Sequence, residues 1–300
     1  KYGGYWEWLQ TDGKPIDLST RNPLALLMLR DNKSNVNRVI GNIQFDYKMH
    51  FLPDLHLLLN LGIDNASGKG DDNIDSLMAT DYKTGGRRSH YEQKKKNTLA
   101  DISLFYAKDI KSINSKFDIL VGHSYQDFLT EVSNFPAYGQ DGEVIPGSTP
   151  TFATDRPRYR LESYLSRVNF TVANKYLLTA SIRRDASSKF LPENRVGYFP
   201  AVAAAWKMNE DLFKGSSVVN ELKLRVGWGV TGQQELYGTG GSFNPYYPYL
   251  PVYSQSNNSA QYQFGNTFYS FLRPGAYDKT IKWETTTTLN FGLDFTLLKN

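Results

Sequence analysis

The stretch WETTTTLNFGLDFT, residues 283–296, alternates strictly between two kinds of side chain. One set comprises Trp283, Thr285, Thr287, Leu289, Phe291, Leu293 and Phe295, and the residues between them are polar or small. Successive side chains of a β-strand point to opposite faces, so this pattern predicts a long strand with one apolar and one polar face. Most strands have only about 5–6 residues. The length of this one raises the question of what its apolar face contacts.

The same alternation recurs along the chain and predicts about nine strands in all. The other candidate segments are residues 40–51, 55–63, 99–107, 117–126, 164–172, 176–184, 198–208 and 221–229. Their apolar rows include Phe45, Leu57, Ile102, Leu178, Leu224 and Phe291. We therefore expect an all-β protein.

The predicted connections differ in length at the two ends of the strands. Short turns lie at 51–54, 109–115, 173–175 and 209–220, and longer segments lie at 65–97, 128–158, 188–195 and 232–280. Antiparallel up-and-down strands with short periplasmic turns and long extracellular loops are typical of a large transmembrane β-barrel. The apolar face would then contact lipid, and Trp283 would lie near the outer interface. A two-sheet sandwich, with the polar residues in solvent, stays open as an alternative.

Composition excludes several classes of protein. The chain has 300 residues, 40% of them hydrophobic, and no apolar run long enough for a membrane-spanning helix. Its net charge of +4 gives no indication of nucleic-acid binding. The absence of cysteine excludes disulfides and thiol catalysis.

No catalytic or metal-binding constellation stands out, so we expect neither an enzyme, nor a cofactor, nor a metal site. His50 and His56 flank a turn without the spacing of a ligand pair. The sequence GHSYQ at 122–126 lacks the second glycine of a nucleophile elbow. The acidic stretch DNASGKGDDNID at 64–75 fits a solvated loop better than a calcium loop.

Four motifs in one order carry a family resemblance. They are ASIRRDASSKF (180–190), NRVGYFPAVAAAW (194–206), LKLRVGWGVTG (222–232) and IKWETTTTLNFGLDF (281–295). Together they resemble the barrel of SusC/RagA-type TonB-dependent, or TonB-linked, outer-membrane transporters. The departures are small: Ala201 stands where serine is common, and Gln233 stands where asparagine is common.

The resemblance implies a barrel of about 22 strands closed by a plug, of which residues 1–300 would be a middle portion. We expect a partial barrel domain, without plug, TonB box or last strands, and with extracellular loops near 65–97, 128–158 and 232–280. The implied function is import of oligosaccharides or peptides across the cell outer membrane. A SusD-like surface lipoprotein would form the lid, TonB would act through the missing N-terminal part, and outer-membrane lipid would surround the barrel. The alternative is a soluble or surface β-sandwich that binds glycans.

Two sets of candidate site residues follow. The mid-strand charges expected to face the lumen are Arg167, Arg183, Lys223, Arg225 and Glu284. The segment 232–280 is rich in aromatic residues, and its candidates for ligand or lid contact are Tyr246, Tyr247, Tyr249, Tyr253, Tyr262, Phe268 and Tyr269. Aromatic side chains at this density mark a contact surface, or they pack against one another and the barrel rim. The basic residues between 83 and 96 are either solvated or in contact with anionic lipopolysaccharide.

Overall fold

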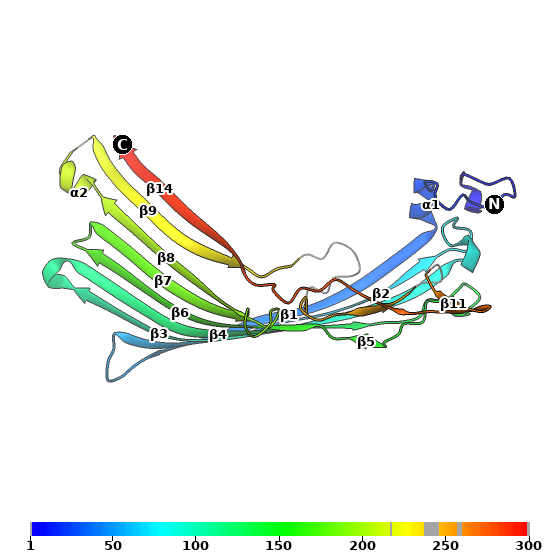
Figure 1. The fold of residues 1–300 in the computed structure, drawn as a ribbon. Helices are drawn as coiled ribbons and strands as arrows, with labels where there is room; N and C mark the ends of the chain where they lie inside the picture. Colours follow the sequence, from blue (N-terminus) through cyan, green and yellow to red (C-terminus); the bar gives the residue numbers. More distant parts are fainter. Residues whose placement is uncertain (1, 217, 237–245, 257–259, 299–300) are drawn as a thin grey trace. The chain divides into compact units, whose positions relative to one another are not determined.

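The computed structural model describes residues 2–216, 218–236, 246–256 and 260–298. Within these residues, nine long strands form one sheet in which each strand lies beside its neighbour in the sequence (Figure 1). The strands are β1 (Arg30–Lys48), β2 (Leu55–Ile74), β3 (Arg87–Ile110), β4 (Ser115–Ser133), β6 (Arg158–Val172), β7 (Tyr176–Ser187), β8 (Val196–Lys207), β9 (Val219–Gln233) and β14 (Glu284–Leu297). The prediction of an all-β, up-and-down fold is confirmed.

Shorter elements occupy the connections. The strand β5 (Thr154–Asp155) pairs with β4, β10 (Tyr253–Gln255) pairs with β13 (Leu272–Pro274), and β11 (Tyr262–Phe264) pairs with β12 (Thr267–Tyr269). The helical elements are η1 (Tyr2–Gly4), α1 (Pro23–Met28), η2 (Tyr82–Thr84), η3 (Lys111–Ile113) and α2 (Asn209–Leu212). The alternation pattern did not predict α1, which begins because the Asn22 side chain accepts hydrogen bonds from the first helical N–H groups and Pro23 follows it. Within the described residues, no helix has the length and hydropathy needed to cross a membrane.

The strand register keeps the two faces of the sheet separate. Val226 of β9 lies opposite Ala204 of β8 and Phe291 of β14. The next residue, Gly227, lies opposite Ala203 and Asn290. Apolar side chains therefore line up across three strands on one face, and small or polar side chains line up on the other.

The prediction that residues 65–97 form an outer loop is largely wrong. The strand β2 continues to Ile74 and β3 starts at Arg87, so only residues 75–86 connect them. In this part of β2, Asn65, Ser67 and Lys69 lie on one face, and the other face carries Ala66 and Gly68, so both faces are polar or small. A strand that meets water on both sides carries no period-2 signal, which explains the error. The predicted turn at 173–175 and the connection at 188–195 match the strand ends.

Contacts divide the chain into two compact units, and each strand from β1 to β4 contributes to both of them. The first unit comprises residues 1–41, 63–97 and 128–158. It has a small core of Ala25, Ile74, Met78 and Ala79. At its edge Asp72 pairs with Arg30 at 2.6 Å, so a strand of this unit is fixed by charge as well as by backbone hydrogen bonds.

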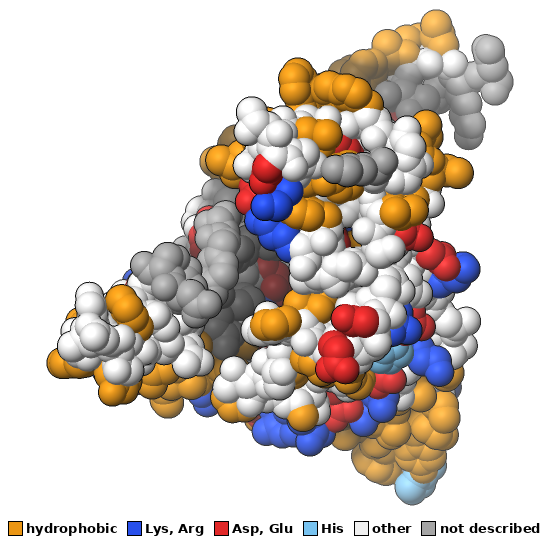
Figure 2. All heavy atoms as spheres, turned by 90° about the vertical axis from the view of Figure 1, so that its right-hand side faces the viewer, with side chains coloured by type: hydrophobic (Ala, Val, Ile, Leu, Met, Phe, Trp, Pro, Cys, Tyr) orange, Lys and Arg blue, Asp and Glu red, His pale blue; other side chains and the backbone are white. Residues whose placement is uncertain are grey.

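The second unit comprises residues 42–62, 98–127 and 159–300, and its apolar face is uncovered. Phe291 is 73% exposed and Phe45 is 55% exposed. No second sheet of the described chain packs on this face, so the β-sandwich alternative is wrong. In the view of Figure 2, hydrophobic side chains (orange) form a continuous area at the lower right, whereas charged side chains gather across the middle. Exposed apolar area of this extent marks a surface that contacts a membrane, another protein or a ligand.

Candidate ligand-binding surface

A row of hydrogen bonds crosses the polar face of the second unit. The Asn60 side chain donates to Asp101 at 3.2 Å, and the Asn169 amide donates to Asp118 at 2.9 Å. Thr179 Oγ1 in turn donates to the Asn169 oxygen at 2.8 Å. These contacts join β2 to β3, β4 to β6 and β6 to β7 at half-buried positions. Each polar group keeps a partner, and the face remains able to bind polar ligand groups.

The register places the five mid-strand charges on this same polar face. Arg167 lies opposite Ser181, and Arg183 lies opposite Leu165 and Phe199. Lys223 and Arg225 lie opposite Asp294 and Gly292 of β14, and Glu284 lies opposite Gln233. That this face lines a lumen stays a prediction.

Two of these cations are held by carboxylates. Arg183 Nε is 2.7 Å from Asp185, and its guanidinium also donates to Ser163 at 3.0 Å. Arg225 is 2.7 Å from Asp294, across the β9–β14 pair. Both arginine side chains are about half exposed, so each keeps donors available on the open side of the face.

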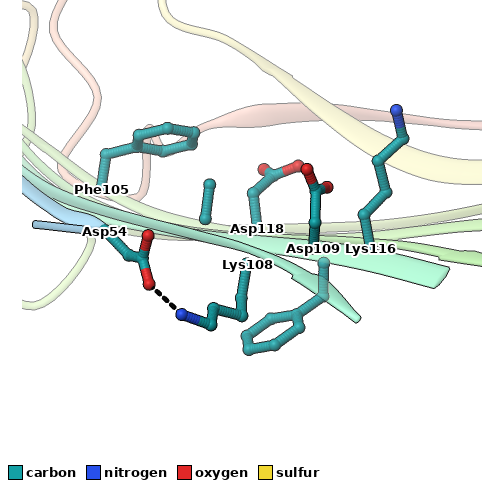
Figure 3. Close-up of a pocket in the computed structure, with 8 residues that line it drawn as sticks. Asp54, Phe105, Lys108, Asp109, Lys116 and Asp118 are labelled. Carbon is teal, nitrogen blue, oxygen red and sulfur yellow. Dashed lines mark hydrogen bonds and ion pairs between the residues drawn. The ribbon is translucent and has the colours of Figure 1, made fainter. Parts of the chain in front are cut away.

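A hollow of about 300 Å³ near the β3–β4 turn does not form a ligand site. Figure 3 shows Phe105, Asp109 and Asp118 on one side of the sheet. Asp54 and Lys108, joined by an ion pair, lie on the other side. The hollow therefore has walls on both faces rather than a single concave surface.

A buried lysine lies in the β7–β8 connection, and sequence reasoning missed it. The Lys189 side chain is 3% exposed, with Nζ 2.9 Å from the Glu235 carboxylate and 4.3 Å from the centre of the Tyr159 ring. Burial, followed by the nearby Glu235 charge, raises the pKa of Tyr159 to about 12. The Tyr246 ring lies 6.2 Å from that of Tyr159. The cluster thus ties the aromatic segment 246–280 to the ends of β6 and β7.

Trp283 belongs to a neighbouring aromatic cluster, on the opposite side of the sheet from the one that its alternation with residues 285–295 predicts. It precedes β14, and its ring packs edge-on against Phe190 at 5.7 Å and Phe199 at 5.3 Å. Its indole N–H donates to the Arg195 carbonyl at 2.8 Å. Phe199 points to the polar face, because it lies opposite Arg183. Three of the motif segments therefore meet in one packed group.

The predicted aromatic contact residues divide into two groups. Tyr246, Tyr247 and Tyr249 are partly buried, whereas Tyr253, Tyr262, Phe268 and Tyr269 are each more than half exposed. The strands β11 and β12 form a hairpin that turns at Gly265, whose φ of 62° favours glycine. The rings of Phe264 and Tyr269 contact each other at 5.7 Å within it. The aromatic segment therefore contains rings that pack against one another and also exposes rings on its surface.

Residues 64–74 of the acidic stretch lie in β2, and Asp64 and Asp71 have separate cationic partners. Asp64 pairs with Arg38 at 2.7 Å, and Asp71 lies 2.7 Å from His90 Nδ1. Asp71, and then Glu92, raise the pKa of His90 above its ordinary value. No group of three or more potential ligands of a metal occurs in the described part of the chain.

With this geometry established, comparison with known proteins identifies the family. A family model described as "TonB dependent receptor-like, beta-barrel" matches residues 2–299. This chain belongs to the TonB-dependent receptor-like β-barrel family. Its SusC-type character rests on a likeness in sequence, and likenesses to solved structures support the fold.

The chain is 38% identical to TonB-dependent receptor SusC of Bacteroides thetaiotaomicron, over 99% of this chain and 30% of that protein. It therefore spans about 30% of the length of this relative. Among solved structures, it superposes on the RagAB peptide transporter with a TM-score of 0.75 and 18% identity, over 96% of this chain and 32% of that one. The 'open-open' state of the RagAB peptide importer gives a TM-score of 0.71. The structural matches establish the fold, and the family is one of receptors and transporters rather than of enzymes.

Proposed function

We propose that this chain is part of an outer-membrane, TonB-dependent active transporter that imports oligosaccharides or peptides. The observation that carries the proposal is the uncovered two-faced sheet. Its apolar face fits the lipid of an outer membrane, and its polar face fits a wet lumen. The peptide cargo of the RagAB importer supports one of the two substrate classes.

The chain's own residues would act by binding rather than by covalent chemistry. Both substrate classes carry many hydrogen-bonding groups, and peptides add charged termini. The half-exposed guanidinium groups of Arg183 and Arg225 each have a donor side free beyond the paired carboxylate. In this proposal they hold ligand oxygens on the lumen side. Inward release would depend on coupling to TonB through other parts of the protein.

The exposed aromatic hairpin is proposed to contact the partner or the ligand at the mouth. Tyr262 and Phe268 are more than half exposed and stand on a two-stranded hairpin with defined register. Tyrosine and phenylalanine side chains of this kind are enriched at protein interfaces and stack on sugar rings. A SusD-like surface lipoprotein is the proposed partner, and it would act as a lid over the lumen.

The test is isolation of the full-length protein from outer membranes in detergent, followed by mass spectrometry of what co-purifies. A stoichiometric surface lipoprotein is the expected result. Growth of a deletion strain on a peptide digest and on a malto-oligosaccharide, each as sole carbon source, then separates the two substrate classes. Recovery of the protein in the soluble fraction, without a lipoprotein, would refute the proposal.

A further inference from the structure

The two faces of β3 can be told apart by the direction of its side chains. Figure 3 shows Phe105 and Asp109 on one side of the sheet and Lys108 on the other. Side chains alternate along a strand, so Lys108 shares its side with the even-numbered residues of β3. This side, here named the outer face, carries in order Tyr106, Leu104, Ile102, Ala100, Thr98, Lys96, Lys94, Glu92, His90 and Arg88.

The neighbouring strand β2 continues the outer face. The ion pair of Asp71 with His90, at 2.7 Å, places the odd-numbered residues of β2 on the same side. That row starts with the apolar side chains from Leu55 to Ile63 and reaches Lys69 before Asp71. Both strands therefore change from apolar to charged in the same direction.

The lysines of β3 follow directly on an apolar stretch of the same face. The outer-face residues between Lys96 and Lys108 are Thr98, Ala100, Ile102, Leu104 and Tyr106. Lys96 is therefore the first charged side chain of this face after the apolar residues of the strand.

Three lysines of the outer face lie near three carboxylates. Two of these carboxylates, Asp71 and Glu92, lie 2.7 Å and 3.3 Å from His90. Lys94, Lys96 and Lys69 are exposed. Glu131 lies 3.6 Å from Lys96 and is shared with Arg156 at 2.6 Å. No ion pair joins Lys69 or Lys94 to another residue of the described chain. The patch thus has positive charge available for an anion.

A cavity of about 510 Å³ lies farther along the outer face. Its polar walls include Asp71 and Asn73 of β2 and Arg88 and His90 of β3, and its apolar walls include the rings of Phe135 and Tyr138. The Phe135 ring packs edge-on against His90 at 4.8 Å. The Arg88 guanidinium donates to the Gly139 carbonyl at 3.2 Å, which fixes it at the wall. Aromatic rings beside carboxylate, amide and guanidinium groups suit a saccharide ring with its hydroxyls.

We infer that this patch and cavity bind the phosphorylated sugar head of a lipopolysaccharide. The lysines at 69, 94 and 96 contact its phosphates, and the cavity holds a sugar of the adjoining core oligosaccharide. Lipopolysaccharide presents acyl chains, then phosphates, then sugars on moving away from the membrane. The outer face presents apolar residues, then lysines, then the sugar-sized cavity in the same order. The inference rests on the proposed outer-membrane location.

The test uses the full-length protein purified in detergent, and measures retention of purified rough lipopolysaccharide. The double variant Lys94→Glu/Lys96→Glu should retain it at least about tenfold less tightly, since each basic residue near an anionic surface contributes about 1 kcal/mol. Lys95→Glu is the matched control, because it makes the same change on the same strand but on the opposite face. Dephosphorylated lipopolysaccharide should bind the unaltered protein as weakly as the double variant binds the intact form.

A separate variant tests the role of the cavity. Phe135→Ala should weaken binding of rough lipopolysaccharide and leave binding of lipid A, which lacks the core sugars, unchanged. The inference would be overturned if the Lys95 variant and the double variant lost lipopolysaccharide binding equally. It would also be overturned if the unaltered protein bound dephosphorylated and intact lipopolysaccharide equally. Recovery of the lipoprotein partner with every variant shows that the proposed transporter is intact, so only the lipopolysaccharide site would then fail.

Discussion

Two adjacent alanines of β8 provide a direct test of which face contacts lipid. Ala204 lies opposite Val226 on the apolar face, and Ala203 lies opposite Gly227 on the polar face. Both are exposed. We predict that Ala204→Arg strongly destabilises the full-length barrel, whereas Ala203→Arg does not. The two variants carry the same change at neighbouring positions, so they differ only in the face that receives the charge.

The expected magnitude follows from the strand geometry. The apolar row of β9 runs from Leu222 to Val230 with Val226 at its centre. It covers about 27 Å along the strand, or roughly 21 Å along the normal at a tilt of about 40°. Ala204 is therefore close to the midplane, where an arginine on the lipid face costs about 2–4 kcal/mol. This free-energy change reduces the ratio of folded to unfolded protein by a factor of roughly 30 to 700.

Denaturant unfolding of the protein in liposomes measures both variants. Ala203→Arg should change the free energy of unfolding by less than about 0.5 kcal/mol, as is usual for a solvated position. Equal destabilisation by the two substitutions would refute the assignment of the faces. A larger effect of Ala203→Arg would mean that the apolar and aqueous sides have been exchanged.

Three further predictions concern the Lys189 cluster, the Asp71–His90 pair and the aromatic hairpin. Glu235→Gln removes the charged partner of buried Lys189 and should destabilise the protein by about 1–2 kcal/mol in thermal unfolding. The loss should be smaller than for a fully buried ion pair, because the Glu235 side chain is 43% exposed. An unchanged unfolding midpoint would contradict this prediction. Asp71→Asn should lower the pKa of His90 toward its ordinary 6.5, as followed by the pH dependence of its carbethoxylation. The stabilisation from this pair is fully present below about pH 6.5 and is lost as pH rises through the raised pKa, so pH-independent stability would speak against it. Phe268→Ala should reduce recovery of the lipoprotein partner or the uptake of labelled ligand, and full retention of both would exclude the hairpin from either contact.

The sequence predicted the strands wherever one face is apolar. The turn at 173–175 and the long strand β14 follow from period-2 alternation, because these strands are apolar on one face and polar on the other. The outer part of β2 was missed for the opposite reason. Its side chains are polar or small on both faces, and only pairing with neighbouring strands reveals that it is extended.

The candidate site was predictable in part. Alternation alone indicated that Arg183 and Arg225 share a face, since it follows from position in the strand. The burial of Lys189 was not predictable, because it depends on Tyr159 and Glu235, which are distant in the sequence. Trp283 was misplaced for a related reason: it precedes the first residue of β14, so the strand's alternation does not govern its direction.

The separation of the two faces has a consequence for how such a protein can change over generations. A substitution at Ala203 alters only the polar side, and one at Ala204 alters only the apolar side, because neighbouring residues never share a surface. In the proposed transporter, selection for a new ligand can therefore act on the residues of the polar face while the residues of the apolar face stay unchanged. The ligand-binding surface can thus diversify without a change of fold.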